Sequence, residues 1–456
     1  MSSASRLAVL RLRAFRRFFI GYCASLLGSS MASIAVTFAV LRGGGGGTEL
    51  GWVMAARILP LVAMLLVGGV VGDRLGSRRV MITADVARVV TQAGLAVALA
   101  ERATGLGVLL PLVVMWGAAE ALFTPALTAL VPAISDDATL NEANALLGMA
   151  RSTAAIAGPV LAGAVITAAG PAPVLVLDAA SYAVSAFALF GLPPVEAPLR
   201  PATSFLTQLR EGWGEFGSRT WLWVTTACFS LFNLLVWAPF LVLGPVEAQA
   251  RLGGSSAYGL MMAAYGAGAV IGGALLLGRR PRRPLLVATA AGTGWALPSS
   301  ALACGLPLAG VCAATLLAGV GSAVCGSLYG TVTQRQIPPG ARARVGAYTS
   351  FGSYVLGPIG LAAAGPLASL SGARHVLAFG AAWQLASTAV VLLLPAVRSV
   401  SGEVPSVSGE VLSGEVSSVS GEVSSGEVPT GEVLSGAAPS GEAPEAGPGA
   451  VAEPAP

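Results

Sequence analysis

The sequence predicts an all-α integral membrane protein with twelve transmembrane helices in two pseudo-symmetric bundles of six. Of its 456 residues, 55% are hydrophobic and 11% are charged, whereas about a quarter of the residues of a soluble protein are charged. Apolar runs long enough to cross a bilayer recur along the chain, and arginines gather between alternate runs. A soluble fold could not bury this much apolar surface, but lipid solvates the outer faces of a helical membrane protein. The lipid bilayer is therefore the first partner that we expect.

Charge is divided unevenly along the chain. All 26 basic residues are arginines, and up to Arg398 they exceed the acids by 13. Nine glutamates beyond Arg398 bring the net charge back to +4. The basic excess thus belongs to the apolar part of the chain, so we expect no nucleic-acid partner.

Residues suited to metal or hydrolytic chemistry are scarce. There is one histidine, His375, and the cysteines lie in or beside apolar runs without metal-ligand spacing. We therefore expect no metal, no cofactor and no enzymatic activity. The five cysteines, which we interpret as small hydrophobic residues, are Cys23, Cys228, Cys304, Cys312 and Cys325.

The apolar runs define the spans in order. Residues 1–17 are a basic segment with five arginines, and the first span, 18–41, follows without an obvious signal-peptide cleavage site. The other eleven spans are predicted at 50–72, 79–100, 105–131, 140–168, 172–193, 221–244, 256–278, 284–304, 307–334, 343–370 and 374–396.

The arginines orient these spans. Nineteen of them fall on the side of the N-terminus, four fall on the opposite side, and three lie inside spans. Since basic loops remain in the cytoplasm, we expect a multi-pass protein of the cell (inner) membrane with both termini cytoplasmic.

The two halves resemble each other in sequence. Gly69–Arg79 aligns with Gly273–Arg283, and Gly158-Pro159 aligns with Gly357-Pro358. Parallel repeats of this kind build the two halves of some transporters. We predict one six-helix bundle at residues 18–193 and a second at 220–397.

Two polar segments lie outside the bundles. Residues 194–219 are predicted to be a cytoplasmic linker with an amphipathic helix on the membrane surface, and a plain solvated linker is the alternative. Residues 398–456 repeat S-G-E-V, cannot form a core and are predicted to be disordered. This tail either folds back onto the basic face or has no role.

The turn between the second and third spans carries the most specific pattern, G-V-V-G-D-R-L-G-S-R-R. Gly76 allows the positive φ that a tight turn requires, and Asp73 can pair with an arginine or with a helix N-terminus. The spacing resembles the signature loop between helices 2 and 3 of the major facilitator superfamily. The resemblance implies alternating access, with this turn as a cytoplasmic latch. The predicted latch consists of Gly69, Asp73, Arg74, Gly76, Arg78 and Arg79.

Charged residues inside spans are costly and mark a pathway or a structural pair. Asp85 and Arg88 are three residues apart on one helix, so we expect them to neutralise each other. Glu120 has no opposite charge at i±3 or i±4 and is the first candidate for proton coupling. Asp178 is the second candidate. The alternative for each acid is a structural role, which for Glu120 means pairing with an arginine of a neighbouring helix.

The resemblance also implies that the first, fourth, seventh and tenth helices line a central cavity. Several aromatic and polar residues share the helical face of Glu120. The candidates for binding a substrate are Trp116, Phe123, Thr124, Arg57, Arg151 and Asn233.

The fifth span partly resembles the glycine- and proline-containing motif of helix 5 in drug–proton antiporters, although Ala154 and Ala162 replace two glycines of that motif. Further runs, such as F-R-R-F-F and L-D-A-A-S-Y, resemble the macrolide-efflux and enterobactin-exporter branch. A proline removes one backbone donor and bends a helix. The predicted helix-bend residues are Gly158, Pro159, Gly163, Gly357 and Pro358.

Together these patterns predict a monomeric exporter of a small amphipathic molecule, such as a drug, a siderophore or a secondary metabolite, driven by proton antiport. One alternative is a nutrient or peptide importer of the same fold. The other is a membrane sensor or assembly protein that does not transport.

Overall fold

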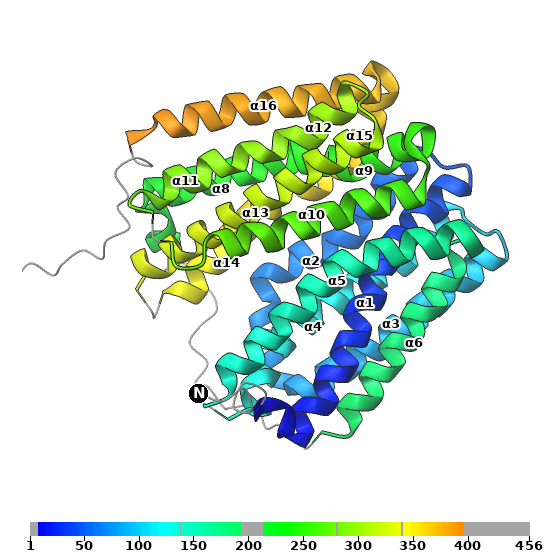
Figure 1. Ribbon diagram of the computed structural model, residues 1–456. Coiled ribbons are helices and arrows are strands. Elements are labelled where there is room, and N and C mark those ends of the chain that lie inside the picture. Colours follow the sequence, from blue (N-terminus) through cyan, green and yellow to red (C-terminus); the bar gives the residue numbers. More distant parts are fainter. Residues whose placement is uncertain (1–7, 137, 193–212, 280, 339–340, 396–456) are drawn as a thin grey trace, which may run out of the picture. The chain divides into compact units, whose positions relative to one another are not determined.

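Helices and the short turns between them make up the residues that the computed structural model describes, 8–136, 138–192, 213–279, 281–338 and 341–395 (Figure 1). The side chains of 65–75, 343 and 344, the predicted tail and most of the predicted linker lie outside the described part. The first half comprises η2 (Ala8–Arg11), α1 (Arg13–Arg42), α2 (Gly47–Leu75), α3 (Ser77–Ala100), α4 (Leu106–Ala133), α5 (Leu140–Ala169) and α6 (Ala172–Phe190).

The second half follows with helices that are more often interrupted. It comprises α8 (Thr220–Phe232), η3 (Asn233–Trp237), α9 (Ala238–Glu247), η4 (Ala248–Leu252), α10 (Ser255–Leu275), α11 (Pro284–Ala291), η5 (Gly292–Trp295), α12 (Ala296–Ala303), α13 (Leu308–Gln336), α14 (Arg342–Tyr354), α15 (Gly357–Ser371) and α16 (Ala373–Leu393).

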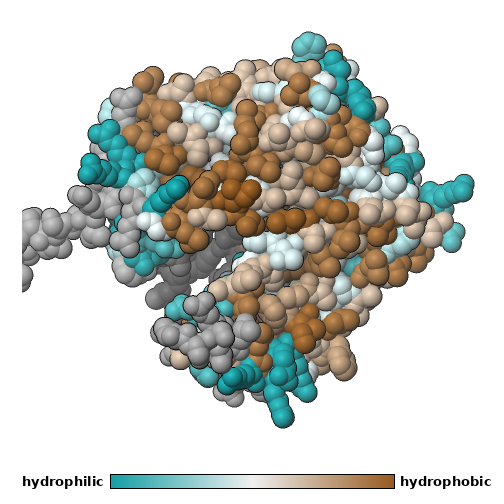
Figure 2. Space-filling view, viewed as in Figure 1, coloured by the Kyte–Doolittle hydropathy of each residue, from teal (hydrophilic) through white to brown (hydrophobic). Residues whose placement is uncertain are grey.

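These helices have the length and composition of membrane spans. Among the described residues, eleven are long and apolar enough to cross a bilayer; α2, a helix of 29 residues, is not among them because part of it lies outside the described side chains. Apolar residues cover much of the surface in Figure 2. Large side chains that face outward include Phe187, Phe190, Leu370, Phe379 and Leu393. Lipid can solvate these groups, whereas water cannot do so favourably.

The same helix pairs pack in both halves. In the first half α1 contacts α5 and α6, α3 contacts α4 and α6, and α2 contacts α4. The corresponding spans of the second half repeat this pattern: α9 contacts α15 and α16, α11 contacts α13, α12 contacts α16, and α10 contacts α13. The packing therefore has the internal symmetry that the sequence repeat predicts.

Prolines follow three of the irregular segments of the second half. A proline has no N–H to donate to the carbonyl four residues earlier. The π-helical turn η3 precedes Pro239, the 3₁₀ turn η5 precedes Pro298, and the eleventh span breaks between α14 and α15 just before Pro358. The seventh span also runs on to Leu252, further than the sequence predicts.

The two halves touch through small residues at the ends of α2, α5, α10 and α15 that lie away from the arginine-rich turns. We call this the far end, and the arginine-rich end the basic end. Thr167 on α5 bonds Ser256 on α10 at 2.7 Å, and Phe38 of α1 packs against Tyr258 of α10 with ring centroids 6.0 Å apart. A methyl group on Gly259 would collide with the α5 backbone at Pro159. Backbone contact this close depends on glycine.

Candidate functional site

An ion pair joins α2 and α4 inside the first half. Arg57 donates to Glu120 at 2.9 Å and to the hydroxyl of Ser33 on α1 at 2.8 Å. Its guanidinium lies 3.7 Å above the ring of Trp116. The helices approach so closely here that a methyl group on Gly117 would collide with the backbone of Arg57. Of the pairings that the sequence leaves open for Glu120, the structure has the one with Arg57.

A second ion pair lies on α3. Asp85 and Arg88 are 3.3 Å apart, and their side chains are almost completely buried. The guanidinium of Arg88 lies 4.3 Å from the ring of Phe123 and 5.1 Å from the ring of Tyr182. Contact with aromatic faces stabilises a buried cation, so Arg88 is held by groups from three helices.

Polar side chains connect the two ion pairs. Trp116 donates through Nε1 to the hydroxyl of Tyr182 at 3.3 Å, and that hydroxyl is 2.7 Å from the hydroxyl of Ser29. Trp116 therefore touches Arg57 on one side and Tyr182 on the other, and Tyr182 in turn faces Arg88. We call this set, together with the two ion pairs and Asp178, the first-half network.

Asp178 on α6 is the acid of the network without an arginine partner among the described residues. Its side chain is completely buried. One oxygen accepts a bond of 3.3 Å from Ser181, and the other has no hydrogen-bond partner in the described structure. Gly28 on α1 lies against the carboxylate and leaves no room for a side chain. Arg57 and Arg88 are near enough to interact with Asp178 electrostatically but form no ion pair with it.

The acids of the network differ in how much of each side chain is exposed, and they outnumber the arginines. The side chain of Glu120 is 35% exposed and that of Arg57 is 23% exposed, whereas Asp85 and Asp178 are fully buried. Within the described first half, three carboxylates face two guanidinium groups. Full ionisation would leave one negative charge without compensation in an apolar interior, which is costly.

The remaining substrate candidates are dispersed. Thr124 is exposed on α4 and bonds only the carbonyl of Glu120 among the described groups, at 3.4 Å. Arg151 donates to Tyr22 at 2.8 Å. Asn233 lies in the second half, where its amide donates to the carbonyls of Phe229 and Ser353 at 3.0 and 3.2 Å. Asn233 thereby joins the seventh span to the end of α14, close to the break in the eleventh span.

The predicted latch is described only in part. Gly76 has a φ of +76° and ends α2, a conformation that suits glycine. Arg78 donates to the carbonyls of Leu189 and Phe190 at 3.0 and 2.8 Å and so caps the end of α6, while Arg79 is exposed. Gly69, Asp73 and Arg74 belong to helix α2, and their side chains lie outside the described ones.

The helix-bend candidates have two different surroundings. Gly158, Pro159 and Gly163 are buried, and both Pro159 and Gly163 face α10 across the contact between the halves. Gly357 and Pro358 begin α15 at the break in the eleventh span. The first group permits close packing, and the second marks a change of helix direction.

Three members of the network were not predicted from the sequence, namely Ser29, Ser33 and Tyr182. Tyr182 lies four residues after Asp178, on the same face of α6, so helical spacing was the available signal. The two serines carry no such signal. No cluster of metal-ligating side chains occurs in the described part of the chain, and the five cysteines are free thiols.

Two curated proteins are similar to this chain along much of its length. The multidrug efflux pump Tap of Mycobacterium tuberculosis is 28% identical over 392 residues, which cover 82% of this chain and 91% of Tap. The uncharacterized MFS-type transporter YfiS of Bacillus subtilis is 27% identical over 303 residues, 63% of this chain and 70% of YfiS.

Solved structures share the fold at low sequence identity. The nucleoside transporter NupG superposes with a TM-score of 0.64 at 14% identity, and a bacterial homologue of the iron transporter ferroportin, in an inward-facing state, superposes with 0.63 at 17%. Both alignments cover 84% of this chain and 98% of the other. Finally, the family model of the Major Facilitator Superfamily matches residues 18–361, and the chain therefore belongs to this superfamily of multi-pass membrane transporters, which carry small molecules and are not enzymes.

Proposed function

We propose that the chain exports a small amphipathic molecule from the cell in exchange for protons. The similarity to the efflux pump Tap supports the outward direction. The excess of arginines at the basic end supports an orientation with that end in the cytoplasm of the cell membrane.

The observation that carries the proton-coupling proposal is the unbalanced charge of the first-half network. Two arginines compensate two of the three acids, and Asp178 is the one left without an ion-pair partner among the described residues. One bound proton neutralises the network. Glu120 is the acid of the network whose side chain is partly exposed, so we assign to it the exchange of the proton with the exterior, and to Asp178 the site that holds the proton.

The contact between the halves supports a transport cycle. Small residues bring α5 against α10 and α2 against α15 at the far end. With the far end outside the cell, this arrangement closes the outer side. Opening it requires these contacts to part, and the latch, with Asp73 and Arg78, then holds the cytoplasmic side closed.

The test uses purified protein in liposomes with an imposed pH gradient and radiolabelled chloramphenicol, a neutral aromatic molecule, as the probe. In Asp178→Asn and in Glu120→Gln, transport driven by the gradient should fall to the rate measured without a gradient. Exchange of labelled for unlabelled chloramphenicol at equal pH should persist, because it needs no net proton movement.

Two matched controls carry the same chemical changes on exposed acids outside the network. Asp136→Asn and Glu101→Gln should keep gradient-driven transport, since both side chains face solvent. Normal coupling in both network variants would refute the assignment of the proton site.

A further inference from the structure

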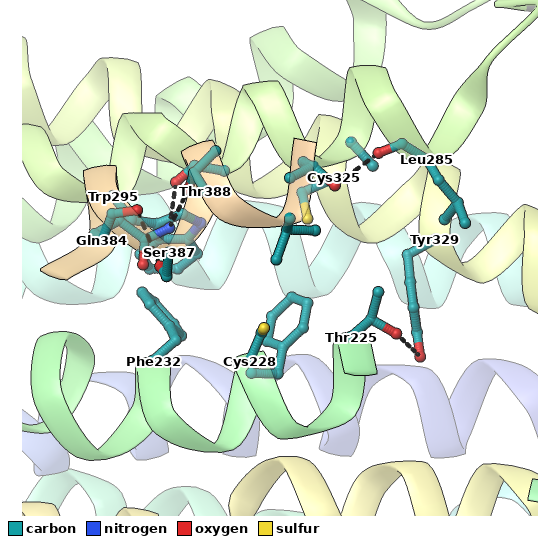
Figure 3. Close-up of a pocket in the computed structure, with 15 residues that line it drawn as sticks. Thr225, Cys228, Phe232, Leu285, Trp295, Cys325, Tyr329, Gln384, Ser387 and Thr388 are labelled. Carbon is teal, nitrogen blue, oxygen red and sulfur yellow. Dashed lines mark hydrogen bonds between the residues drawn. The ribbon is translucent and has the colours of Figure 1, made fainter. Parts of the chain in front are cut away.

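A cavity lies within the second half, between α8, α11 with η5, α13 and α16 (Figure 3). It encloses about 80 Å³ of space open to water. Among the described residues, its lining contains no charged side chain. It is therefore unlike the first-half network, which is built from charged groups.

Aromatic side chains form a fixed wall of this cavity. Phe232 and Trp295 meet edge to face with ring centroids 4.7 Å apart. Trp237 supports Trp295 from behind at 4.9 Å and 87°. Phe229 and Tyr329, at 6.1 Å, continue the wall. Rings held in this way favour a flat apolar guest that packs against them.

One polar group of the lining is left unsatisfied. Gln384 on α16 is only 8% exposed, and its amide nitrogen donates to the carbonyl of Gly292 at 3.0 Å and to Thr388 at 3.4 Å. Because the carbonyl of Gly292 can only accept, the nitrogen must face it, and this fixes the place of the amide oxygen. That oxygen has no hydrogen-bond partner among the described residues. A buried acceptor without a partner is costly, and Gln384 belongs to the wall of the cavity.

We propose that this cavity binds the uncharged aromatic end of the transported molecule, a ring system bearing an O–H or N–H group that donates to Gln384. The lack of charge in the lining disfavours an ionised group there. Pockets that hold a whole drug-sized molecule enclose about 300–1,000 Å³, so this smaller cavity fits one ring system. The proposal rests on the proposed function, because it says which part of the transported molecule the cavity binds. Binding to the cavity can nevertheless be measured without measuring transport.

A cysteine in the wall of the cavity can report whether a ligand is bound. The half-buried thiol of Cys228 lies on its wall (Figure 3), whereas Cys312 does not line it. A variant that keeps Cys228 as its only cysteine allows alkylation by N-ethylmaleimide to be followed at that one thiol. The matched control keeps only Cys312. Both are measured in detergent without a pH gradient.

Three probes separate the features of the site. They are 2-naphthol, which is neutral and has a donor, 2-methoxynaphthalene, which lacks the donor, and 2-naphthalenesulfonate, which is charged. 2-Naphthol should slow the alkylation of Cys228, and its half-protecting concentration should be about tenfold lower than that of 2-methoxynaphthalene, as for one hydrogen bond. The sulfonate should give no protection, and Cys312 should react at the same rate throughout.

Gln384→Leu in the Cys228-only background should make 2-naphthol and 2-methoxynaphthalene equivalent. Gln334→Leu, on an exposed glutamine of α13, should leave their difference intact. Gln384→Leu also removes the hydrogen bond to Gly292, so this variant can fail to fold for that reason alone. In that case the proposal is tested by comparing the three probes on the Cys228-only protein that keeps Gln384.

Equal protection by the two neutral probes, protection by the sulfonate, or equal protection of Cys312 would each overturn the proposal. Protection as predicted without gradient-driven transport would uphold the site and refute proton antiport. Gradient-driven transport without protection would leave the proposed function standing and remove this site.

Discussion

At the scale of single residues, Arg57 and Arg88 organise the interior of the first half. Each guanidinium pairs with one acid and rests on aromatic rings. Together these contacts offset the free-energy cost of burying a cation, which lipid alone could not solvate. The two arginines therefore compensate two of the three carboxylates of the network, and Asp178 is the one without an ion-pair partner among the described residues.

The pair on α3 gives a stability prediction. Arg88→Met leaves Asp85 buried without its cation, which should lower the free energy of unfolding by about 3–5 kcal/mol. Adding Asp85→Leu removes the stranded charge and should recover most of this loss. Thermal denaturation in detergent compares the stability of the two variants. A double variant no more stable than Arg88→Met would show that the unpaired charge of Asp85 does not cause the loss of stability.

The candidate site could be predicted from the sequence only in part. A charged residue in an apolar run is conspicuous, so Arg57, Asp85, Arg88, Glu120 and Asp178 were identifiable. Which acid meets which arginine depends on how three helices pack, and helical spacing settles this only for pairs on one helix. The neutral cavity was not predicted, because its lining residues are ordinary in a membrane helix and only Gln384 stands out.

At the scale of helices, glycines on α10 decide how closely the halves approach. A methyl group on Gly259 would meet the backbone of α5, whereas one on Gly273, further along the same helix, would meet nothing within 4 Å. The same substitution at the two positions changes helix propensity in both cases, but only at Gly259 does the added side-chain volume fall at the contact between the halves.

Gly259→Val should force the far end apart and shift the protein towards the state open there, while Gly273→Val should not. The reporter is Ser255→Cys in a background without other cysteines, because Ser255 is 2% exposed at this contact. Its maleimide labelling should be faster in Gly259→Val than in the parent or in Gly273→Val. Equal rates in all three proteins would mean that this contact does not control the opening.

Prolines mark the other helices expected to move. The break between α14 and α15 and the irregular segments η3 and η5 all precede a proline. The sequence identifies the prolines, but not which of them interrupts a helix, since α5 continues through Pro159. Helix α4 likewise continues through Pro111 and Pro125.

At the scale of the molecule, the fold was largely predictable because span length and arginine position are direct consequences of the bilayer. The sequence repeat also predicted the matching packing of the two halves. The ends of the spans were predicted less accurately, because a turn at the membrane surface can remain helical. The seventh span, for example, continues to Leu252. The tail and most of the linker lie outside the described residues, although residues 213–217 are helical and Phe216 stacks on Tyr348 of α14.

Deletion of residues 399–456 separates a transporter from a protein that acts through its tail. The deletion removes the S-G-E-V repeats but none of the described helices. Transport of chloramphenicol by the shortened chain should match that of the full chain in the same vesicles. Loss of transport with normal expression and folding would indicate that the tail is a functional part.

The most direct test of the account is the direction and energy source of transport. In inside-out vesicles the basic end faces the bath, and an acidic lumen supplies the proton gradient. We predict that chloramphenicol, a neutral aromatic molecule that an acidic lumen does not trap by itself, accumulates in the lumen against its own gradient and that nigericin, which collapses the pH gradient, releases it. Accumulation that survives nigericin, or that appears only when the gradient is reversed, would contradict proton-driven export.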